Sequence, residues 1–150
     1  MTCKDRAVSR ELRVGGEGPG RSIARAKEVR MSTRRFAHHS LDAFHVAQQA
    51  LRLGYTLTKT WPRGNALLAD QLRRALLGAY LQLTEAASRS GADRSNRFRW
   101  SRAEANEAAG AAEAAVVIGL SSESDIEPLL ALLDRLVAML TRLGGFGTKR

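Results

Sequence analysis

The stretch that most constrains this fold is residues 67–89, LLADQLRRALLGAYLQLTEAASR, in which apolar residues recur at every third or fourth position. This spacing places the apolar side chains on one face of an α-helix about 19 residues long. The face consists of Leu68, Leu72, Ala75, Ala79, Leu83 and Ala86. Because a single helix of this length cannot bury its apolar face alone, the stretch predicts a bundle in which other helices cover it.

A preceding helix is predicted from Ser40, as its N-cap, to the residue before Pro62, with Asp42 in the favourable first turn. Two adjoining faces run along it. One consists of Leu41, Phe44, Gln48, Leu51, Tyr55 and Thr58. The other is made mostly of small residues, namely Ala43, Ala47, Ala50, Gly54 and Leu57. We therefore expect this helix to make contacts on two sides, and the next helix to run from residue 66 to residue 89.

A third helix is predicted to begin at Ser90, with Asp93 as the second member of a capping box, and to end at Gly119. Its inward face is Phe98, Ser101, Ala105, Ala108, Ala112, Ala115 and Val116. A fourth helix is expected to follow the loop at residues 121–125 and to contain Pro128 in its first turn. Its face is Ile126, Leu129, Leu130, Leu133, Leu136, Val137, Leu140 and Leu143, and Gly144 with Gly145 closes it.

Four helices joined by short loops predict an all-α chain, an up-down-up-down antiparallel four-helix bundle over residues 36–143. Residues 1–35 combine scattered arginines and glycines with few large apolar residues, so we expect a disordered basic segment there. Met31 directly precedes the periodic region and is a candidate for the true translation start. Residues 144–150 are expected to be a frayed tail.

The net charge favours a polyanionic partner, such as nucleic acid or an anionic surface. The formal charge is +9 at pH 7 in 150 residues. Residues 1–35 hold ten Lys and Arg against four Asp and Glu, whereas residues 36–150 hold fourteen against eleven. Most of the excess positive charge therefore lies outside the predicted bundle.

Compartment and membrane association can also be addressed from the sequence. Cys3 is the single cysteine, so no intrachain disulfide can form, and a reducing compartment is the simplest interpretation. No apolar run approaches the roughly 20 residues that a membrane-spanning helix needs. We expect a cytoplasmic protein without membrane association.

No residue pattern in the sequence favours a catalytic site. No glutamate has a histidine three residues later, which excludes the di-metal carboxylate bundles. His38, His39 and His45 cluster at the start of the first helix and are best explained as an exposed helix entrance. Arg34 and His39 have the spacing of HEPN-type ribonucleases, but in those enzymes the pair lies on a late helix. We expect no catalytic residues, no metal and no cofactor.

A cluster of arginines near the second loop is the strongest candidate for a binding site. It consists of Arg89, Arg94, Arg97, Arg99 and Arg102, with Phe98 and Trp100 between them and Asp93 as the one acidic residue. Arginine pairs with phosphate and stacks on bases, and an exposed aromatic ring can stack on an unpaired base. The alternative is a solvated bundle end in which Phe98 belongs to the core and Trp100 covers a loop.

Several segments resemble a bacterial four-helix-bundle family that includes the 23S rRNA intervening-sequence proteins and the accessory variability protein of diversity-generating retroelements. The resemblance covers residues 36–143. It rests on residues 40–44 (SLDAF), residues 68–75 (LADQLRRA), Glu85, Arg89, Phe98, residues 105–107 (ANE) and Gly119. Residues 78–86 lack the proline and the final glycine that the family commonly has in its second helix.

The resemblance implies an antiparallel bundle that assembles as a homopentamer. In the retroelement members it also implies a basic surface that contacts nucleic acid and a reverse transcriptase. The faces of small residues on the first and third helices suit such an oligomer. Our first hypothesis is therefore a non-enzymatic, oligomeric accessory protein that binds RNA or DNA. The alternative is an oligomeric protein-interaction scaffold without nucleic-acid binding.

Overall fold

The computed structural model describes residues 36–145; the predicted basic segment, with Met31, and residues 146–150 lie outside this range. Within it the chain is helical and has no strand, which confirms the all-α prediction for the part described. The elements are η1 (Ala37–Ser40), α2 (Asp42–Lys59), η2 (Arg63–Asn65), α3 (Ala66–Ala87), α4 (Gly91–Val117) and α5 (Glu123–Leu143).

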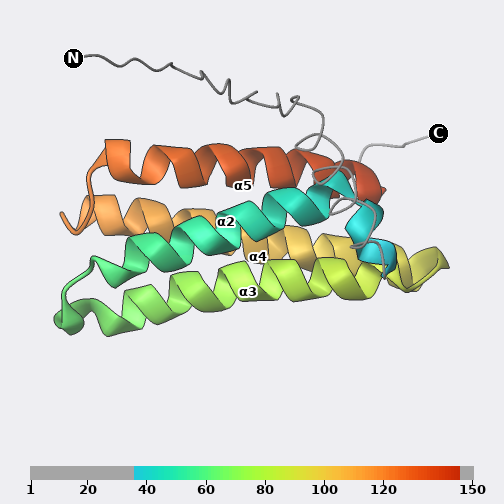
Figure 1. The fold of residues 1–150 in the computed structure, drawn as a ribbon, viewed down its shortest axis with the longest axis horizontal. Helices are drawn as coiled ribbons and strands as arrows, with labels where there is room; N and C mark the ends of the chain where they lie inside the picture. Colours follow the sequence, from blue (N-terminus) through green and yellow to red (C-terminus); the bar gives the residue numbers. More distant parts are fainter. Residues whose placement is uncertain (1–35, 146–150) are drawn as a thin grey trace, which may run out of the picture. The chain divides into compact units, whose positions relative to one another are not determined.

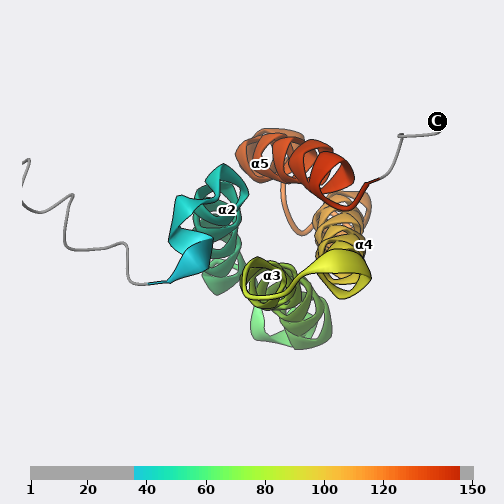
Figure 2. The same cartoon turned by 90° about the vertical axis from the view of Figure 1, so that its right-hand side faces the viewer.

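Neighbouring helices lie side by side and run in opposite directions (Figure 1). Viewed along their axes they occupy four corners in the order α2, α3, α4, α5, and α5 also contacts α2 (Figure 2). The bundle therefore has two ends. We call them the η1 end, which holds the start of α2, the α3–α4 turn and the end of α5, and the η2 end, which holds the α2–α3 and α4–α5 connections.

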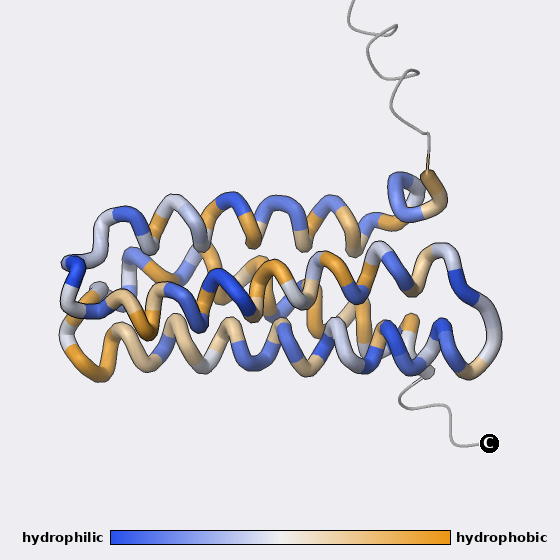
Figure 3. The backbone as a smooth tube through the Cα atoms, turned by 90° about the horizontal axis from the view of Figure 1, so that it is seen from below, coloured by the Kyte–Doolittle hydropathy of each residue, from blue (hydrophilic) through white to orange (hydrophobic). Residues whose placement is uncertain are grey.

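The core is formed by the helix faces that the apolar periodicity predicts for α3, α4 and α5. On α3, Leu72, Ala75, Ala79, Leu83 and Ala86 are buried, and Leu68 is half-buried. On α5 the buried residues are Ile126, Leu129, Leu133, Leu136 and Leu140. Hydrophobic and hydrophilic positions accordingly alternate along each helix (Figure 3). Burial of these apolar side chains drives the helices together.

On α2, the face of small residues is the one that enters the core. Ala43, Ala47, Ala50 and Gly54 are buried together with Phe44, Val46 and Thr58. The other predicted face is wrong in part, because Gln48 and Tyr55 are exposed. The small residues of α2 and α4 are buried within one bundle.

The start of α2 differs from the prediction. Ser40 is not its N-cap: it lies in η1, where its Oγ donates to the carbonyl oxygen of Ala37 at 2.8 Å. Leu41 occupies the N-cap position, and Asp42 lies in the first turn as predicted. The short η1 turn therefore takes the serine hydroxyl that would otherwise cap the helix.

The start of α4 has the predicted N-cap but not the predicted capping box. Ser90 is the N-cap residue, yet among residues 36–145 its side chain makes no capping hydrogen bond. Asp93 instead accepts from Arg89, with Nη1 and Oδ2 2.9 Å apart. The guanidinium on the preceding turn competes successfully for this carboxylate because it offers a charge-assisted hydrogen bond.

A complete capping box forms at the start of α5. The hydroxyl of Ser122 accepts from the backbone N–H of Asp125, and the Asp125 carboxylate accepts from the backbone N–H of Ser122. The hydrogen bonds from Ser122 lower the pKa of Asp125. Because α5 begins at Glu123, Pro128 is its sixth residue and lies in the second turn, which corrects the predicted first-turn position.

The two connections at the η2 end are joined by a hydrogen bond between side chains. Trp61 is buried, and its Nε1 donates to the Oγ of Ser121 at 2.8 Å, across 60 positions of sequence. Gly119, at φ 71°, ends α4 in the left-handed conformation as predicted. The indole thereby ties the α2–α3 hairpin to the α4–α5 hairpin.

Two glycines predict opposite effects of the same substitution. A Cβ at Gly54 would overlap Cδ1 of the buried Leu76, so we expect Gly54→Ala to lower the free energy of unfolding by about 1–2 kcal/mol. Gly110 has nothing within 4 Å of such a Cβ, so Gly110→Ala is expected to raise it by about 0.5–1 kcal/mol. Urea denaturation measures both; a stabilising Gly54→Ala would contradict the close approach of α2 and α3.

Candidate nucleic-acid interface

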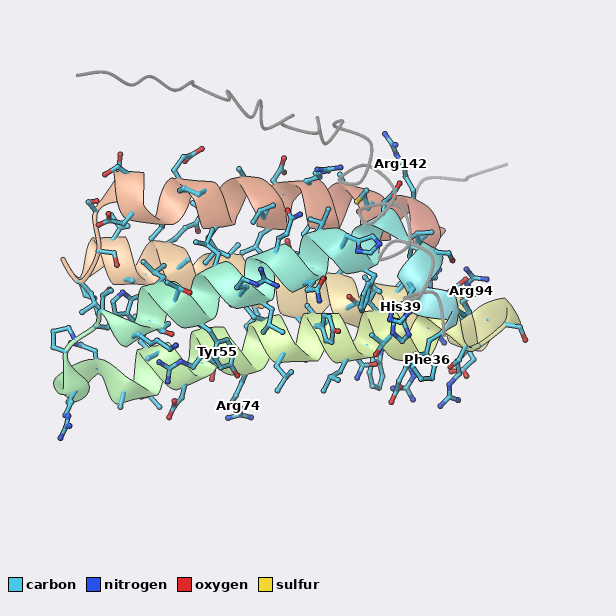
Figure 4. The ribbon with its side chains drawn as sticks, viewed as in Figure 1. Phe36, His39, Tyr55, Arg74, Arg94 and Arg142 are labelled. Carbon is cyan, nitrogen blue, oxygen red and sulfur yellow. The ribbon has the colours of Figure 1, made fainter. Side chains whose placement is uncertain are left out.

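The predicted site residues lie at the η1 end, around the beginning of α4. The first half of this helix carries Arg94, Arg97, Arg99 and Arg102. Its second half carries Glu104, Glu107 and Glu113 and no basic residue. Arg94 is seen at the same end of the bundle as Arg142, on the last turn of α5 (Figure 4). The charge of α4 therefore reverses along its length, and the basic half meets the end of α5.

Arg89 and Arg97 pair with carboxylates of other described residues. Arg97 pairs with Glu85 of α3 at 2.9 Å and donates to the Oε1 of Gln82 at 3.0 Å. Arg89 pairs with Asp93 at 2.9 Å. Arg97 therefore links α3 to α4, and Arg89 joins the α3–α4 turn to the first turn of α4. Both contribute less to a free positive surface than the sequence suggests.

Trp100 is exposed, with 60% of its surface accessible. The guanidinium of Arg97 lies over its ring, 5.3 Å from the centroid. Two hydrogen bonds join this part of α4 to α3: Arg97 donates to Gln82, and Ser101 donates to the carbonyl oxygen of Ala79. Trp100 therefore lies at the same height along the bundle as residues 79–82 of α3. An exposed indole held by a cation fits a stacking surface, because the opposite ring face stays open to solvent.

Arg99 and Arg102 lie on the other side of α4, against the end of α5. The Nε of Arg99 donates to the backbone oxygen of Gly144 at 3.1 Å, and Nη1 of Arg102 lies 3.3 Å from the Oγ1 of Thr141. Arg99 thus stabilises the negative end of the α5 dipole. Arg142 adds a further exposed positive charge at this end of the bundle, and the prediction missed it because it is distant in sequence. The antiparallel return of α5 was the signal that could have identified it.

Arg94 lies between these two groups. It is half-buried, and its guanidinium is 5.5 Å from the centroid of the buried Phe98 ring. The alternative placement of Phe98 in the core is therefore confirmed, whereas Trp100 is too exposed to act as a loop cover. The arginines therefore spread around α4 rather than forming one flat patch: Arg97 contacts Trp100 on the α3 side, and Arg99 and Arg102 lie on the α5 side.

The histidines lie at the start of α2 as predicted and contact neighbouring aromatic rings; His45 is exposed, whereas the other two are less exposed than predicted. His38 and His39 are half-buried and contact the ring of Phe44, with centroids 4.6 and 5.5 Å away. Burial, and then the neighbouring His39, lower the pKa of His38, which disfavours its charged form. Arg34, the proposed ribonuclease partner of His39, lies outside the described residues.

Two further properties concern the described range alone. Within residues 36–145, the His, Cys, Asp and Glu side chains do not gather in groups of three that could hold a metal ion. None of the helices described is both long and apolar enough to cross a membrane. Cys3 lies outside this range.

No protein-family model matches the full chain, and no curated protein matches it either. The candidate interface must therefore be judged on its own geometry and charge.

Proposed function

We propose that this chain is a non-enzymatic, up-down-up-down helical bundle of the cytoplasm that binds RNA or DNA at its η1 end as an accessory protein. In this proposal Arg94, Arg99 and Arg102 contact phosphates, and Trp100 stacks on an unpaired base. Arg89 and Arg97 orient the surface through their ion pairs. The proposal also includes two properties that the family resemblance implies: assembly into a homopentamer, and association with a reverse transcriptase or another nucleic-acid enzyme.

The observation that carries this proposal is the reversal of charge along α4 beside an exposed tryptophan. Residues 36–145 hold twelve Lys and Arg against eleven Asp and Glu, so the bundle is close to neutral. A polyanion would find little attraction on an evenly charged surface. The first half of α4 concentrates four arginines and carries an indole that is 60% exposed, so this end of the helix has both features of single-strand binding.

The test is a triple substitution, Arg94→Gln with Arg99→Gln and Arg102→Gln, in the full chain. We expect the affinity for single-stranded RNA to fall at least about tenfold, and the slope of log K against log salt to flatten by about 2, because three phosphate contacts are lost. Fluorescence anisotropy across a salt series measures both. Arg97 stays unchanged because its removal would break the contact with Glu85 and lower stability.

The matched control removes three charges elsewhere: Arg52→Gln with Arg63→Gln and Arg74→Gln. All three side chains are exposed, and none belongs to the η1 end. Equal losses in the two triple variants would assign binding to net charge alone. Unchanged binding in the first variant would show that the η1 end is not the binding site. Thermal unfolding of each variant checks that the fold is retained.

A second candidate is the oligomeric protein-interaction scaffold. It is favoured by exposed leucines on the outer face of α3, namely Leu67, Leu77 and Leu81, at 86%, 39% and 49% exposure. Leu77 and Leu81 lie one turn apart, and neighbouring exposed apolar side chains are typical of surfaces that bind other proteins. Light scattering on the full chain, with and without RNA, separates the two: a stable oligomer without measurable RNA affinity at low salt would favour the scaffold.

A further inference from the structure

An apolar groove lies at the η2 end, between the last turns of α4 and the first turns of α5, away from the basic site. It has a volume of about 330 Å³, and its apolar lining includes Val116, Ile126 and Leu130. Ile126 is buried in the core, whereas the other two are half-buried. Val117 also lines the groove and is 86% exposed, and Ile118 beside it is 58% exposed. This end of α4 therefore exposes aliphatic side chains to solvent beside a groove that has room for an aliphatic side chain of another molecule.

Three carboxylates surround the same groove. Glu113 comes from α4, and Glu123 and Glu127 come from the first two turns of α5. All three are exposed, and none takes part in any of the ion pairs found among residues 36–145. A positively charged occupant would therefore be attracted by all three carboxylates.

The shape of the groove favours a helix as the occupant. Two antiparallel helices leave a seam that accepts the side chains of a third helix at positions i and i+4. At about 330 Å³ the groove is near the lower limit of ligand pockets and suits one or two aliphatic side chains. The carboxylates on both walls would then meet lysines or arginines that flank those side chains on the partner helix.

From this combination we propose that the α4–α5 groove docks a basic amphipathic helix of a partner protein. Leucine-like side chains of the partner insert between Val116 and Leu130, and its basic residues pair with Glu113, Glu123 and Glu127. This site is separate from the arginines at the η1 end, so docking there leaves the proposed nucleic-acid surface open. The inference does not depend on nucleic-acid binding.

The experiment uses the full chain and a short synthetic peptide of leucine, alanine and arginine, with leucines at i and i+4 and arginines beside them. We expect it to bind and to shift the methyl NMR signals of Val116, Ile126 and Leu130. Glu113→Gln with Glu123→Gln and Glu127→Gln should weaken binding at least about tenfold. Val116→Trp, which fills the groove and keeps its charges, should weaken it similarly.

The matched charge control is Asp42→Asn with Asp70→Asn and Asp134→Asn, three exposed carboxylates outside the groove. Unchanged affinity in this control supports the groove. Equal loss in the control, or unaltered binding by Val116→Trp, would show general charge attraction and overturn the proposal. Absence of peptide binding would also overturn the proposal. Shifts of the same methyl signals that depend on protein concentration without peptide would overturn it too, because they would show that a second copy of the chain occupies the groove.

Discussion

Replacement of Phe98 by alanine is expected to be among the most destabilising single changes in this protein, lowering the free energy of unfolding by about 3–5 kcal/mol. Phe98 is 1% exposed and is among the largest fully buried side chains of the bundle. The substitution removes its buried ring and leaves a cavity that alanine-rich neighbours on α4 cannot fill. Since domains of this size are stable by about 5–15 kcal/mol, the variant should remain folded but unfold at a much lower urea concentration.

Trp100→Ala is the matched control, because Trp100 is a second aromatic residue two positions along the same helix. Its exposure predicts a change in stability within about 0.5 kcal/mol. Its affinity for single-stranded RNA should nevertheless fall by roughly 1–3 kcal/mol if the indole stacks on a base. Loss of stability in both variants would contradict the exposed position of Trp100, and loss in neither would contradict the buried position of Phe98.

The second large effect is expected for Ala112→Leu, which should lower the free energy of unfolding by about 1–3 kcal/mol. Ala112 is fully buried in a face of α4 that contains Ala105, Ala108 and Ala115, also without exposure. The larger side chain has no space between closely approaching helices and must push α4 away from its neighbours. We place the effect at the upper end of the range because packed interiors deform little.

Ala103→Leu tests the same change on the exposed face of α4. Leucine and alanine have similar helix propensities, so this variant should unfold within about 0.5 kcal/mol of the original chain. A stable Ala112→Leu protein would mean that the helices are farther apart than described. Denaturant titration of both variants, followed by circular dichroism, provides the comparison.

The sequence predicted the helices better than their ends. On α3 and α5 the leucine periodicity identifies the buried face, because large aliphatic side chains gain most from burial. On α2 the same reasoning also predicted that the face with larger residues is buried, and this is wrong for Gln48 and Tyr55. The distance between α2 and α3 at Gly54 favours small residues instead, and this distance depends on how both helices pack.

The candidate site was predictable as a cluster but not in its internal contacts. Residues 89–102 are close in sequence, so their shared location follows from one helix and one turn. The pair between Arg97 and Glu85 depends on the register of α4 against α3, which short-range patterns do not encode. Arg142 lies at the same end of the bundle through the antiparallel return of α5, and it carries no local signal of its own.

The hydrogen bond between Trp61 and Ser121 gives the protein an internal spectroscopic reference. Trp61 is 8% exposed at the η2 end and Trp100 is 60% exposed at the η1 end, and these are the chain's two tryptophans. Their fluorescence should therefore separate into a blue-shifted component that resists iodide and a red-shifted component that iodide quenches. A ligand at the η1 end would protect the second component and leave the first unchanged, so unlabelled protein can report which end is occupied.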